Sequence, residues 1–536
     1  MGEIRLLDCT LRDGGYLNDW KFGHDNIVTI YERLVSAKVD IIEVGFLDER
    51  RLYDFDRSIL PDTDSVKQTY GDLDRGQSMI VAMIDYGTCG IDRVQECADC
   101  YLDGIRVIFK KDKMRGAIAF CGELKEKGYK VFVQAVSITS YNDAEFAELI
   151  DMVNELEPYA FSLVDTYGLL HKEQLAHYFT MADKRLKQNI GLGYHAHNNF
   201  QLAYANCIEV LESKIDRTLI VDGTLYGMGK SAGNAPIELL AKYMNEHCGK
   251  QYRIHQLLEV IDVTILEIYR KVTWGYNFKF YLSAANDCHP NYVTYLQSKS
   301  KLSVKSICRI LDRIEPEKKL LYDEAYIEKL YLDYQSIECD DTAARTQLAD
   351  IFAEQKVLIL GPGNNVNLQR DRIVRYMEQE NPVVISINFV PHNIPVRYLF
   401  LSNSKRYVQL ATALSRNGGS MKIIATSNIT SASQDFSYVL NYGELLDMEA
   451  EIQDNPLLML LKLLADCRVR SVALAGFDGY DRARTSNYVN ANMEYTFTKE
   501  KAHEINEDVR RGLARAALSQ KITFITDSFY IEGCEK

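Results

Sequence analysis

The sequence lacks several features that would place it in a specialised class. Its 62 lysines and arginines are outnumbered by 75 aspartates and glutamates. The resulting net charge of −13 argues against nucleic acid as a main partner, because phosphate binding needs clustered cations. No apolar run approaches the ~20 residues that a membrane span requires, so we expect no membrane partner. The twelve cysteines are scattered and do not show the spacing of a disulfide framework. We therefore expect the protein to occupy a reducing compartment, the cytoplasm.

The N-terminal segment enters a strand-like run directly, without a charged region followed by an apolar one, so we expect no signal peptide. The 536 residues allow two or three domains. Up to about residue 245, β-branched runs alternate with helix-length amphipathic stretches. Eight of these runs predict strands: Ile4–Leu7, Val39–Phe46, Ser78–Ile84, Ile105–Phe109, Val131–Ile138, Phe161–Asp165, Gly191–His197 and Thr218–Asp222.

Eight evenly spaced β-α units in about 245 residues are typical of a TIM barrel, and rarely of a doubly wound sheet. We therefore predict an α/β protein whose residues 1–250 form a TIM (β/α)8 barrel. Residues 251–337 are predicted to form a helical extension, and the polar stretch 338–354 looks like a boundary between domains. A second strand-helix pattern then predicts a smaller Rossmann-like α/β domain over residues 355–536. Gly361-Pro362-Gly363 lacks the full G-x-G-x-x-G motif and is interpreted as a tight turn.

Metal-ligating side chains stand at two of the predicted strand ends. The first strand can also be extended over the segment Ile4–Gly14, so that Asp13 closes it, and His195 and His197 lie at the end of the seventh predicted strand. Residues i and i+2 of a strand point to the same face, and TIM-barrel active sites lie at the carboxyl ends of the strands. One carboxylate and two imidazoles on one face make a divalent-metal site with open positions for substrate. The alternative is a pair of structural histidines.

Five segments carry a resemblance to a known family. They are Asp8–Gly14, Ile42–Gly45, Asp165–Gly168, His195–Asn199 and Val221–Asn234. In this order they resemble the signature of the DRE-TIM metallolyase superfamily, which includes hydroxymethylglutaryl-CoA lyase, isopropylmalate synthase and 4-hydroxy-2-oxovalerate aldolase. The resemblance covers roughly residues 3–245 and is closest to the pyruvate aldolases of the 4-hydroxy-2-oxovalerate type.

The resemblance implies a role for each matching residue. Asp13, His195 and His197 match the metal ligands, Asn234 matches a fourth ligand used in some members, and Arg12 matches an arginine that stabilises an enolate. The implied ion is Mn²⁺ or Mg²⁺, with Co²⁺ and Zn²⁺ also open. A hard divalent ion can chelate the carboxylate and keto oxygen of a 2-oxo acid. The implied activity is an aldolase-type carbon–carbon lyase that cleaves or forms a 4-hydroxy-2-oxo acid through a pyruvate enolate.

The sequence departs from the aldolase pattern at Tyr16, where those aldolases have a histidine that serves as general base. Phenol is a poor base at pH 7, so Tyr16 is expected to act as an acid or an orienting group. His289 is a candidate base, although a packing role is the alternative. Gln134 and Thr166 are candidate substrate contacts, and filling the barrel core is an equal alternative for Gln134.

Other functions stay open at this point. The barrel could be an acyl-CoA-dependent Claisen synthase or lyase, or a scaffold for a glycosyltransferase-like C-terminal domain. The segment Ser471–Tyr480 is weakly similar to sialyltransferase-like Rossmann domains, which implies a context of surface-glycan or sugar metabolism. The expected partners are a small-molecule 2-oxo acid, an aldehyde and further copies of the chain in a homo-oligomer. A dehydrogenase that receives the aldehyde is an additional hypothesis.

Overall fold

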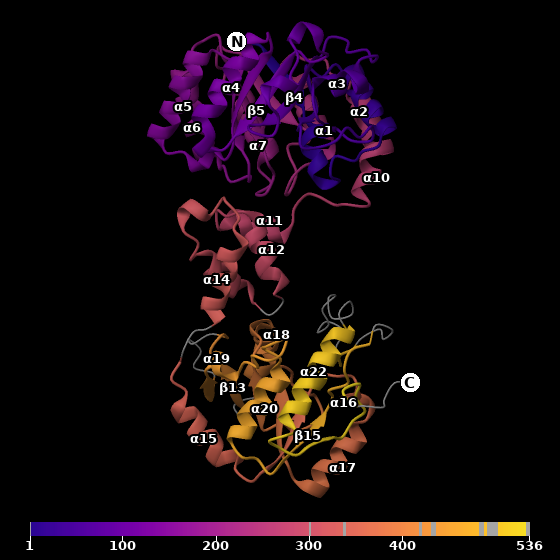
Figure 1. The fold of residues 1–536 in the computed structure, drawn as a ribbon, viewed down its shortest axis with the longest axis vertical. Helices are drawn as coiled ribbons and strands as arrows, with labels where there is room; N and C mark the ends of the chain where they lie inside the picture. Colours follow the sequence, from indigo (N-terminus) through magenta and orange to yellow (C-terminus); the bar gives the residue numbers. More distant parts are fainter. Residues whose placement is uncertain are drawn as a thin grey trace. The chain divides into compact units, whose positions relative to one another are not determined.

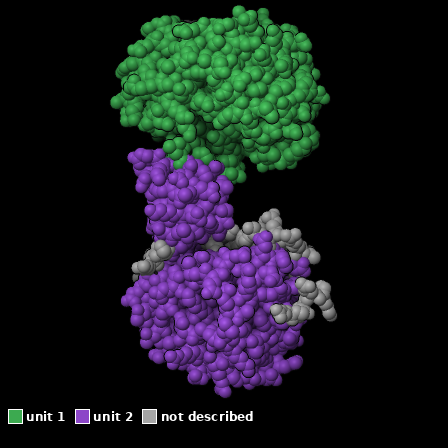
Figure 2. Space-filling view, in the orientation of Figure 1, with its two compact units in different colours: residues 1–290, 319–321 green, residues 291–318, 322–536 purple. Residues whose placement is uncertain are grey.

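The computed structural model describes residues 2–299, 302–335, 339–416, 421–429, 436–481, 487–489 and 502–531. It divides into two compact units, residues 1–290 with 319–321 and residues 291–318 with 322–536 (Figure 2). The predicted helical extension 251–337 is thus shared between the units, and the three-part division stays a prediction. In the described part of the chain, no helix combines the length and apolar character that a membrane span requires.

Unit 1 contains a closed barrel of parallel strands, as predicted. Its strands are β1 (Ile4–Asp8), β2 (Ile41–Leu47), β4 (Met79–Asp85), β5 (Gly104–Phe109), β6 (Lys130–Ala135), β7 (Ala160–Asp165), β8 (Gly191–Ala196) and β9 (Leu219–Gly223). They follow one another in chain order, and the pairing of β1 with both β2 and β9 closes the barrel. A short strand, β3 (Ile59–Leu60), pairs with β2 outside this circle.

Helices surround the barrel strands (Figure 1). They are α2 (His24–Ser36), α3 (Thr63–Tyr70), α4 (Met114–Glu126), α5 (Asp143–Leu156), α6 (Lys172–Arg185), α7 (Ala203–Leu211) and α8 (Ile237–His247). The chain then continues through α9 (Ile254–Val260), α10 (Leu266–Tyr269) and α11 (Phe278–Ala285). Helix α5 shows why they form. Asn142 caps it in a capping box with Glu145, and Phe146, Leu149 and Val153 recur at helical spacing on its buried face.

The barrel interior has two layers. An apolar layer includes Ile41, Phe132 and Ile220. Two positions further along the same strands, and therefore on the same inward face, stand Glu43, Gln134 and Asp222, which are fully or almost fully buried. Arg106 on β5 and Ser162 on β7 are also buried and bonded to this polar set. The layer at the carboxyl ends is therefore polar and charged.

The prediction that the first strand runs to Asp13 is wrong. Strand β1 ends at Asp8, and Asp13 lies in the short helix α1 (Thr10–Asp13). The cause is local: the Asp8 carboxylate accepts hydrogen bonds from the N–H and the hydroxyl of Thr10, which turns the chain out of the strand. Likewise β8 ends at Ala196, and His197 follows it in an isolated bridge to Asn234.

Unit 2 is built around a second parallel sheet of seven strands, which confirms the predicted second α/β domain. The strands are β10 (Lys356–Leu360), β11 (Val383–Ile387), β12 (Tyr398–Leu401), β13 (Lys422–Thr426), β14 (Tyr438–Leu440), β15 (Ser471–Ala475) and β16 (Ile522–Phe524). Their order in the sheet is β14-β13-β12-β11-β10-β15-β16. The chain therefore builds outward from β10 in one direction and then in the other, and the switch lies between β10 and β15.

Helices pack on both faces of this sheet. The chain from Pro290 onward forms the helices α12 (Pro290–Ser298), α13 (Val304–Leu311), α14 (Glu324–Gln335), α15 (Thr342–Phe352), α16 (Asn365–Leu368), α17 (Arg370–Glu380), α18 (Ser404–Arg416), α19 (Tyr442–Leu445), α20 (Pro456–Asp466) and α22 (Ala502–Ala516). The first three, α12 to α14, form a separate helical segment (Figure 1). Val357 and Ile359 of β10 pack in one hydrophobic core with α20, whereas Leu358 and Leu360 pack in another with Ile373 of α17. Helix α15 occupies most of the stretch interpreted as a boundary, and its Phe352 is buried in the first core.

Gly45 on β2 offers a test of the barrel's packing. Its φ is +148°, and a Cβ built on it would lie 1.8 Å from the carbonyl oxygen of Ser58. We expect Gly45→Ala to lower the free energy of unfolding by about 3 kcal/mol, measured by urea denaturation. Gly122→Ala in α4 is the matched control, because its Cβ would meet only Leu156 at 4.0 Å. Equal stability of both variants would contradict the packing described here.

Candidate functional site

Asp13, His195 and His197 meet at the carboxyl end of the barrel, and all three side chains are buried. The Nε2 atoms of His195 and His197 lie 3.6 and 3.9 Å from Oδ2 of Asp13. One potential ligand atom from each residue lies within 4.8 Å of the others. The structure thus brings together the three residues that the sequence singled out.

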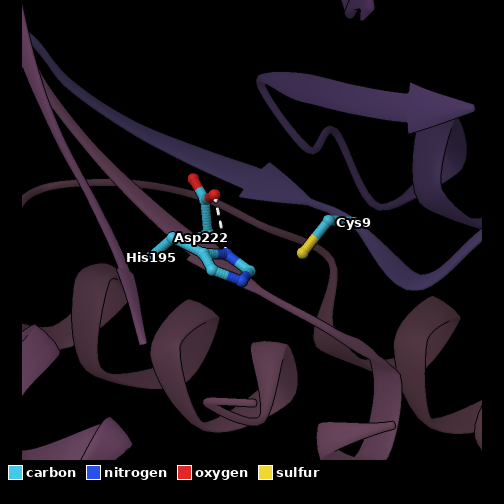
Figure 3. Close-up of side chains that lie close together, drawn as sticks. All are labelled: Cys9, His195 and Asp222. Atoms are coloured by element: carbon cyan, nitrogen blue, oxygen red, sulfur yellow. Dashed lines mark hydrogen bonds and ion pairs between the residues drawn. The ribbon is translucent and has the colours of Figure 1, made fainter. Parts of the chain in front are cut away.

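Both histidines are held by their Nδ1 atoms. Nδ1 of His195 lies 3.0 Å from Oδ2 of Asp222, as Figure 3 shows, and Nδ1 of His197 lies 3.1 Å from the carbonyl oxygen of Lys230. Since both partners are acceptors, each Nδ1 carries the proton and donates it. Nε2 of each ring faces Asp13. With the proton on Nδ1, the neutral form of each ring presents a bare Nε2 there, which is the tautomer that a metal ligand needs.

The charge states also suit a cation. Burial alone would raise the pKa of Asp13, but the neighbouring Arg12 guanidinium and the two histidines hold that pKa well below its ordinary value. Burial lowers the pKa of His197 to about 4, so the ring is neutral near pH 7. Burial opposes protonation of His195 as well, yet Asp13 and Asp222 raise its pKa. A charged carboxylate beside a neutral imidazole is a combination that binds divalent ions.

Two buried polar atoms at the centre of the site lack a hydrogen-bond partner in the described structure. Within the part of the chain that the structure describes, Nε2 of His195 and Oδ1 of Asn234 make no hydrogen bond. A Cβ built on Gly229 would lie 2.6 Å from Oδ1 of Asp13 and 2.2 Å from Nδ2 of Asn234, so Asn234 stands beside Asp13. Buried polar atoms are rarely left unsatisfied. Carboxylate, imidazole and amide oxygen donors fit a divalent cation at this place.

A second trio, Cys9, His195 and Asp222, is also close enough to hold an ion (Figure 3). Cys9, however, donates its thiol to the carbonyl oxygen of Gly223, and burial raises its pKa well above the ordinary value. A thiol ligand must lose its proton. Asp222 is already bonded to both His195 and Arg106. The trio with Asp13 is therefore the better candidate.

Arg12 stands directly beside the candidate metal site. Its Nε donates to Oε2 of Glu43 at 2.8 Å, and its terminal nitrogen bonds to Asp13. Glu43 is shared with Arg106, at 3.1 Å, and Arg106 also bonds to Asp222. A chain of buried ion pairs thus links Arg12 to Asp222 and, through it, to His195. At one end of this network Glu43 positions the guanidinium of Arg12, and at the other end Asp222 positions the imidazole of His195.

Sequence reasoning did not identify Arg106. A signal was present, because Arg106 is the one charged residue in the strand Gly104–Phe109. A charge in a strand that is otherwise apolar needs a buried counter-charge, and Glu43 and Asp222 were available at other strand ends. The partners lie on strands far apart in the chain, and only the closed barrel brings them together.

Tyr16 and His289 lie near the same end of the barrel. The Tyr16 ring packs against Trp20, with ring centroids 4.8 Å apart, and the Lys230 ammonium lies 5.2 Å from its centroid. Tyr16 is an exposed side chain. Desolvation of its hydroxyl group, together with the charge of Asp13, raises its pKa. His289 is partly buried against Tyr167, and burial with the charges of Lys230 and Lys110 lowers its pKa to about 4.

Gln134 and Thr166 are both engaged with protein groups. Gln134 accepts from Arg106 and donates to Ser162 inside the barrel, which fits the alternative that it fills the core. Thr166 directly follows β7, and its hydroxyl accepts the N–H of Ser137 at 2.8 Å. Thr166 is therefore at the carboxyl end, whereas Gln134 lies one layer deeper. Substrate contact by either residue stays a prediction.

Comparisons with known proteins match the barrel part of the chain. Residues 3–264 match the family model described as HMGL-like. The chain is similar to the oxaloacetate decarboxylase of Mycobacterium tuberculosis, with 26% identity over 244 residues that cover 44% of this chain and 69% of the relative. It is also similar to 4-hydroxy-2-oxovalerate aldolase 2 of Salinispora arenicola, with 25% identity over 265 residues that cover 48% and 74%.

Among solved structures, the N-terminal domain of a candidate aldolase from Bacteroides vulgatus is 24% identical and gives a TM-score of 0.48. That match covers 57% of this chain and 99% of the other.

Asp222 is expected to tune the candidate metal site without touching the ion. Asp222→Asn removes the charge that holds the Nδ1 proton of His195. We expect the affinity of chelator-stripped protein for Mn²⁺ to fall 10- to 100-fold in an equilibrium titration. Asp165→Asn is the control, because this buried strand-end carboxylate accepts the N–H groups of Leu169 and Leu170 instead. An Mn²⁺ affinity of Asp222→Asn equal to that of the control would refute the role given to Asp222.

Proposed function

We propose that residues 3–264, which match the HMGL-like family model, form a metal-dependent carbon–carbon lyase of the DRE-TIM metallolyase superfamily and act as a pyruvate aldolase. In this proposal it cleaves or forms a 4-hydroxy-2-oxo acid, and Asp13, His195, His197 and Asn234 hold the ion. The hard oxygen and imidazole donors favour Mn²⁺ or Mg²⁺, with Co²⁺ and Zn²⁺ as alternatives. The names of the curated relatives support an oxo-acid substrate.

The position of Arg12 carries the proposal. When bound, the divalent ion supplies Lewis-acid polarisation of the 2-oxo acid. Arg12 is buried, bonded to Asp13 and fixed by Glu43, so its guanidinium is preorganised beside the ligands. A preorganised cation stabilises the negative charge that develops on the enolate oxygen as the C–C bond breaks. The chain of ion pairs through Glu43 and Arg106 holds Arg12 in this position, so Arg12 does not need to reorient during the reaction.

We assign the proton transfers to Tyr16 and His289. Because the pKa of Tyr16 is raised, its phenol keeps its proton near pH 7 and can donate a hydrogen bond to the aldehyde oxygen. His289 is neutral near pH 7, since its pKa is about 4, and can accept the proton of the 4-hydroxyl group. The neighbouring ammonium groups of Lys230 and Lys110 favour a negative charge on the substrate near this end of the barrel.

Decarboxylation of oxaloacetate is a second candidate function, favoured by the name of one relative. Cleavage of oxaloacetate between C3 and C4 leaves the same pyruvate enolate and releases CO₂ instead of an aldehyde. The same Arg12 position would serve both reactions. An acyl-CoA-dependent reaction, self-association, a dehydrogenase partner and a role in sugar metabolism remain hypotheses from the sequence.

The deciding experiment is exchange of the C3 protons of pyruvate in D₂O, followed by NMR. Chelator-stripped protein with added Mn²⁺ or Mg²⁺ should exchange these protons, and protein without metal should not. Exchange shows that the site forms the enolate of pyruvate. Metal-loaded protein that leaves pyruvate unexchanged would overturn the proposal and favour an acyl-CoA or another oxo acid.

Arg12→Ala should slow this exchange about 10²- to 10³-fold, the usual cost of losing one group that stabilises an oxyanion. Arg50→Ala is the control, because Arg50 is exposed and pairs only with Asp48 among the ion pairs of the described chain. Circular dichroism should show both variants folded. An exchange rate of Arg12→Ala within threefold of the control would remove Arg12 from the mechanism.

Tyr16→Phe and His289→Gln separate the two proton roles. Both variants should keep metal-dependent pyruvate exchange within a few-fold, because neither side chain belongs to the metal or enolate contacts. Both should slow cleavage of a 4-hydroxy-2-oxo acid by about 10²-fold or more, measured as pyruvate release. Unchanged cleavage in either variant would exclude that residue from proton transfer.

A further inference from the structure

Unit 2 contains a cavity of about 460 Å³ that the barrel chemistry does not use. Its lining includes residues just after β10, β11, β12 and β15, such as Gly363, Asn388, Asn403 and Asp478. These strands flank the point where the sheet order switches direction. In open parallel sheets, ligands bind outside the carboxyl ends of the strands at this switch point. The volume lies within the range of about 300 to 1,000 Å³ that is usual for small-molecule sites.

The floor of the cavity is preformed by two loops that touch. The N–H of Gly363 donates to the carbonyl oxygen of Gly476 at 2.8 Å, and a Cβ on Gly363 would lie 2.5 Å from that oxygen. Asp478 accepts the N–H of Asn365 at 2.9 Å. The glycines therefore allow the two loops to pack closely together.

One wall of the cavity is cationic. Arg406 lies in the first turn of α18 and is 5% exposed. Asn403 caps this turn by accepting the N–H groups of Lys405 and Arg406. Arg406 donates to Gln409, and its guanidinium carbon lies 5.9 Å from the centroid of the Tyr488 ring. A helix N-terminus adds partial positive charge beside the guanidinium, and both favour an anion such as phosphate.

Another part of the lining is apolar and aromatic. It includes Leu457 of α20, Val509 of α22 and the rings of Phe477, Tyr480 and Tyr530. Tyr480 is hydrogen-bonded to Tyr488, whose ring lies beside Arg406. Such a wall suits the flat face of a heteroaromatic ring.

The lining also includes Asn388, Asn455 and Asn487. Their amide oxygens accept the N–H groups of Ser402, Leu457 and Asp481. An amide NH₂ group has two hydrogens and can donate to a hydroxyl. Among the described lining residues, Lys299 and Arg406 are cationic and Asp478 is a carboxylate.

We propose that this cavity binds a nucleoside phosphate. The phosphate lies against Arg406 and the N-terminus of α18, the base lies against the aromatic wall, and the sugar hydroxyls meet the amides. This site belongs to unit 2 alone and is independent of the aldolase proposal for the barrel. The combination of a buried cation, amides and an aromatic wall in one cavity matches the three parts of such a ligand.

The test is calorimetric titration of ADP, GDP, UDP, CDP and inorganic phosphate into the full-length chain. Chelator is present, so that metal in the barrel cannot bind the phosphates. At least one nucleoside diphosphate should bind one-to-one, and at least tenfold more tightly than inorganic phosphate. The proposal is overturned by no binding at millimolar nucleotide, or by phosphate that binds as tightly as the nucleotides do.

Variants locate the bound nucleotide. Arg406→Met should weaken it about 10- to 100-fold, the range for loss of a hydrogen bond to a charged group. Arg372→Met is the control, because Arg372 pairs with Asp527 and does not line the cavity. Lys299→Met, at a less buried position, should weaken binding about three- to fivefold and serves if Arg406→Met does not fold. Binding unchanged in both cavity variants would overturn the proposal.

Discussion

The arrangement at the carboxyl end of the barrel depends on the pairing of buried charges. Arg12 and Arg106 are both enclosed, and burying a charge is costly unless a partner compensates it. Glu43 joins the two arginines, and Asp222 pairs with Arg106 and with the ring of His195. These ion pairs therefore fix the position of each charged side chain in the network. The same contacts that offset the cost of desolvation hold Arg12 and His195 where the chemistry needs them.

The two units follow one physical rule with different results. Parallel strands place all their carboxyl ends at one edge, so the loops that follow them converge. In unit 1 the barrel is closed, and its inward face carries an apolar layer below a charged one. In unit 2 the sheet is open, and its two faces are covered by helices. The edge of the open sheet then supplies a cavity where its strand order switches direction.

Much of this was accessible from the sequence, because period and spacing are local signals. The eight barrel strands and the convergence of Asp13, His195 and His197 were predicted from the alternation of elements and from motif order. The helix that carries Asp13 was missed because a single side chain, Asp8, ends the strand early. Arg106 was missed because its partners come from strands distant in the chain. Contacts across a barrel produce no periodic pattern in the sequence from which they could be predicted.

The central claim is that Asp13, His195 and His197 hold a divalent ion. Pulsed electron paramagnetic resonance of Mn²⁺ bound to protein labelled with ¹⁵N-histidine tests it most directly. The account predicts one Mn²⁺ per chain with hyperfine coupling to two histidine nitrogens, and loss of one coupling in His197→Ala. Stoichiometric Mn²⁺ without histidine coupling, or no bound Mn²⁺ at all, would contradict the account.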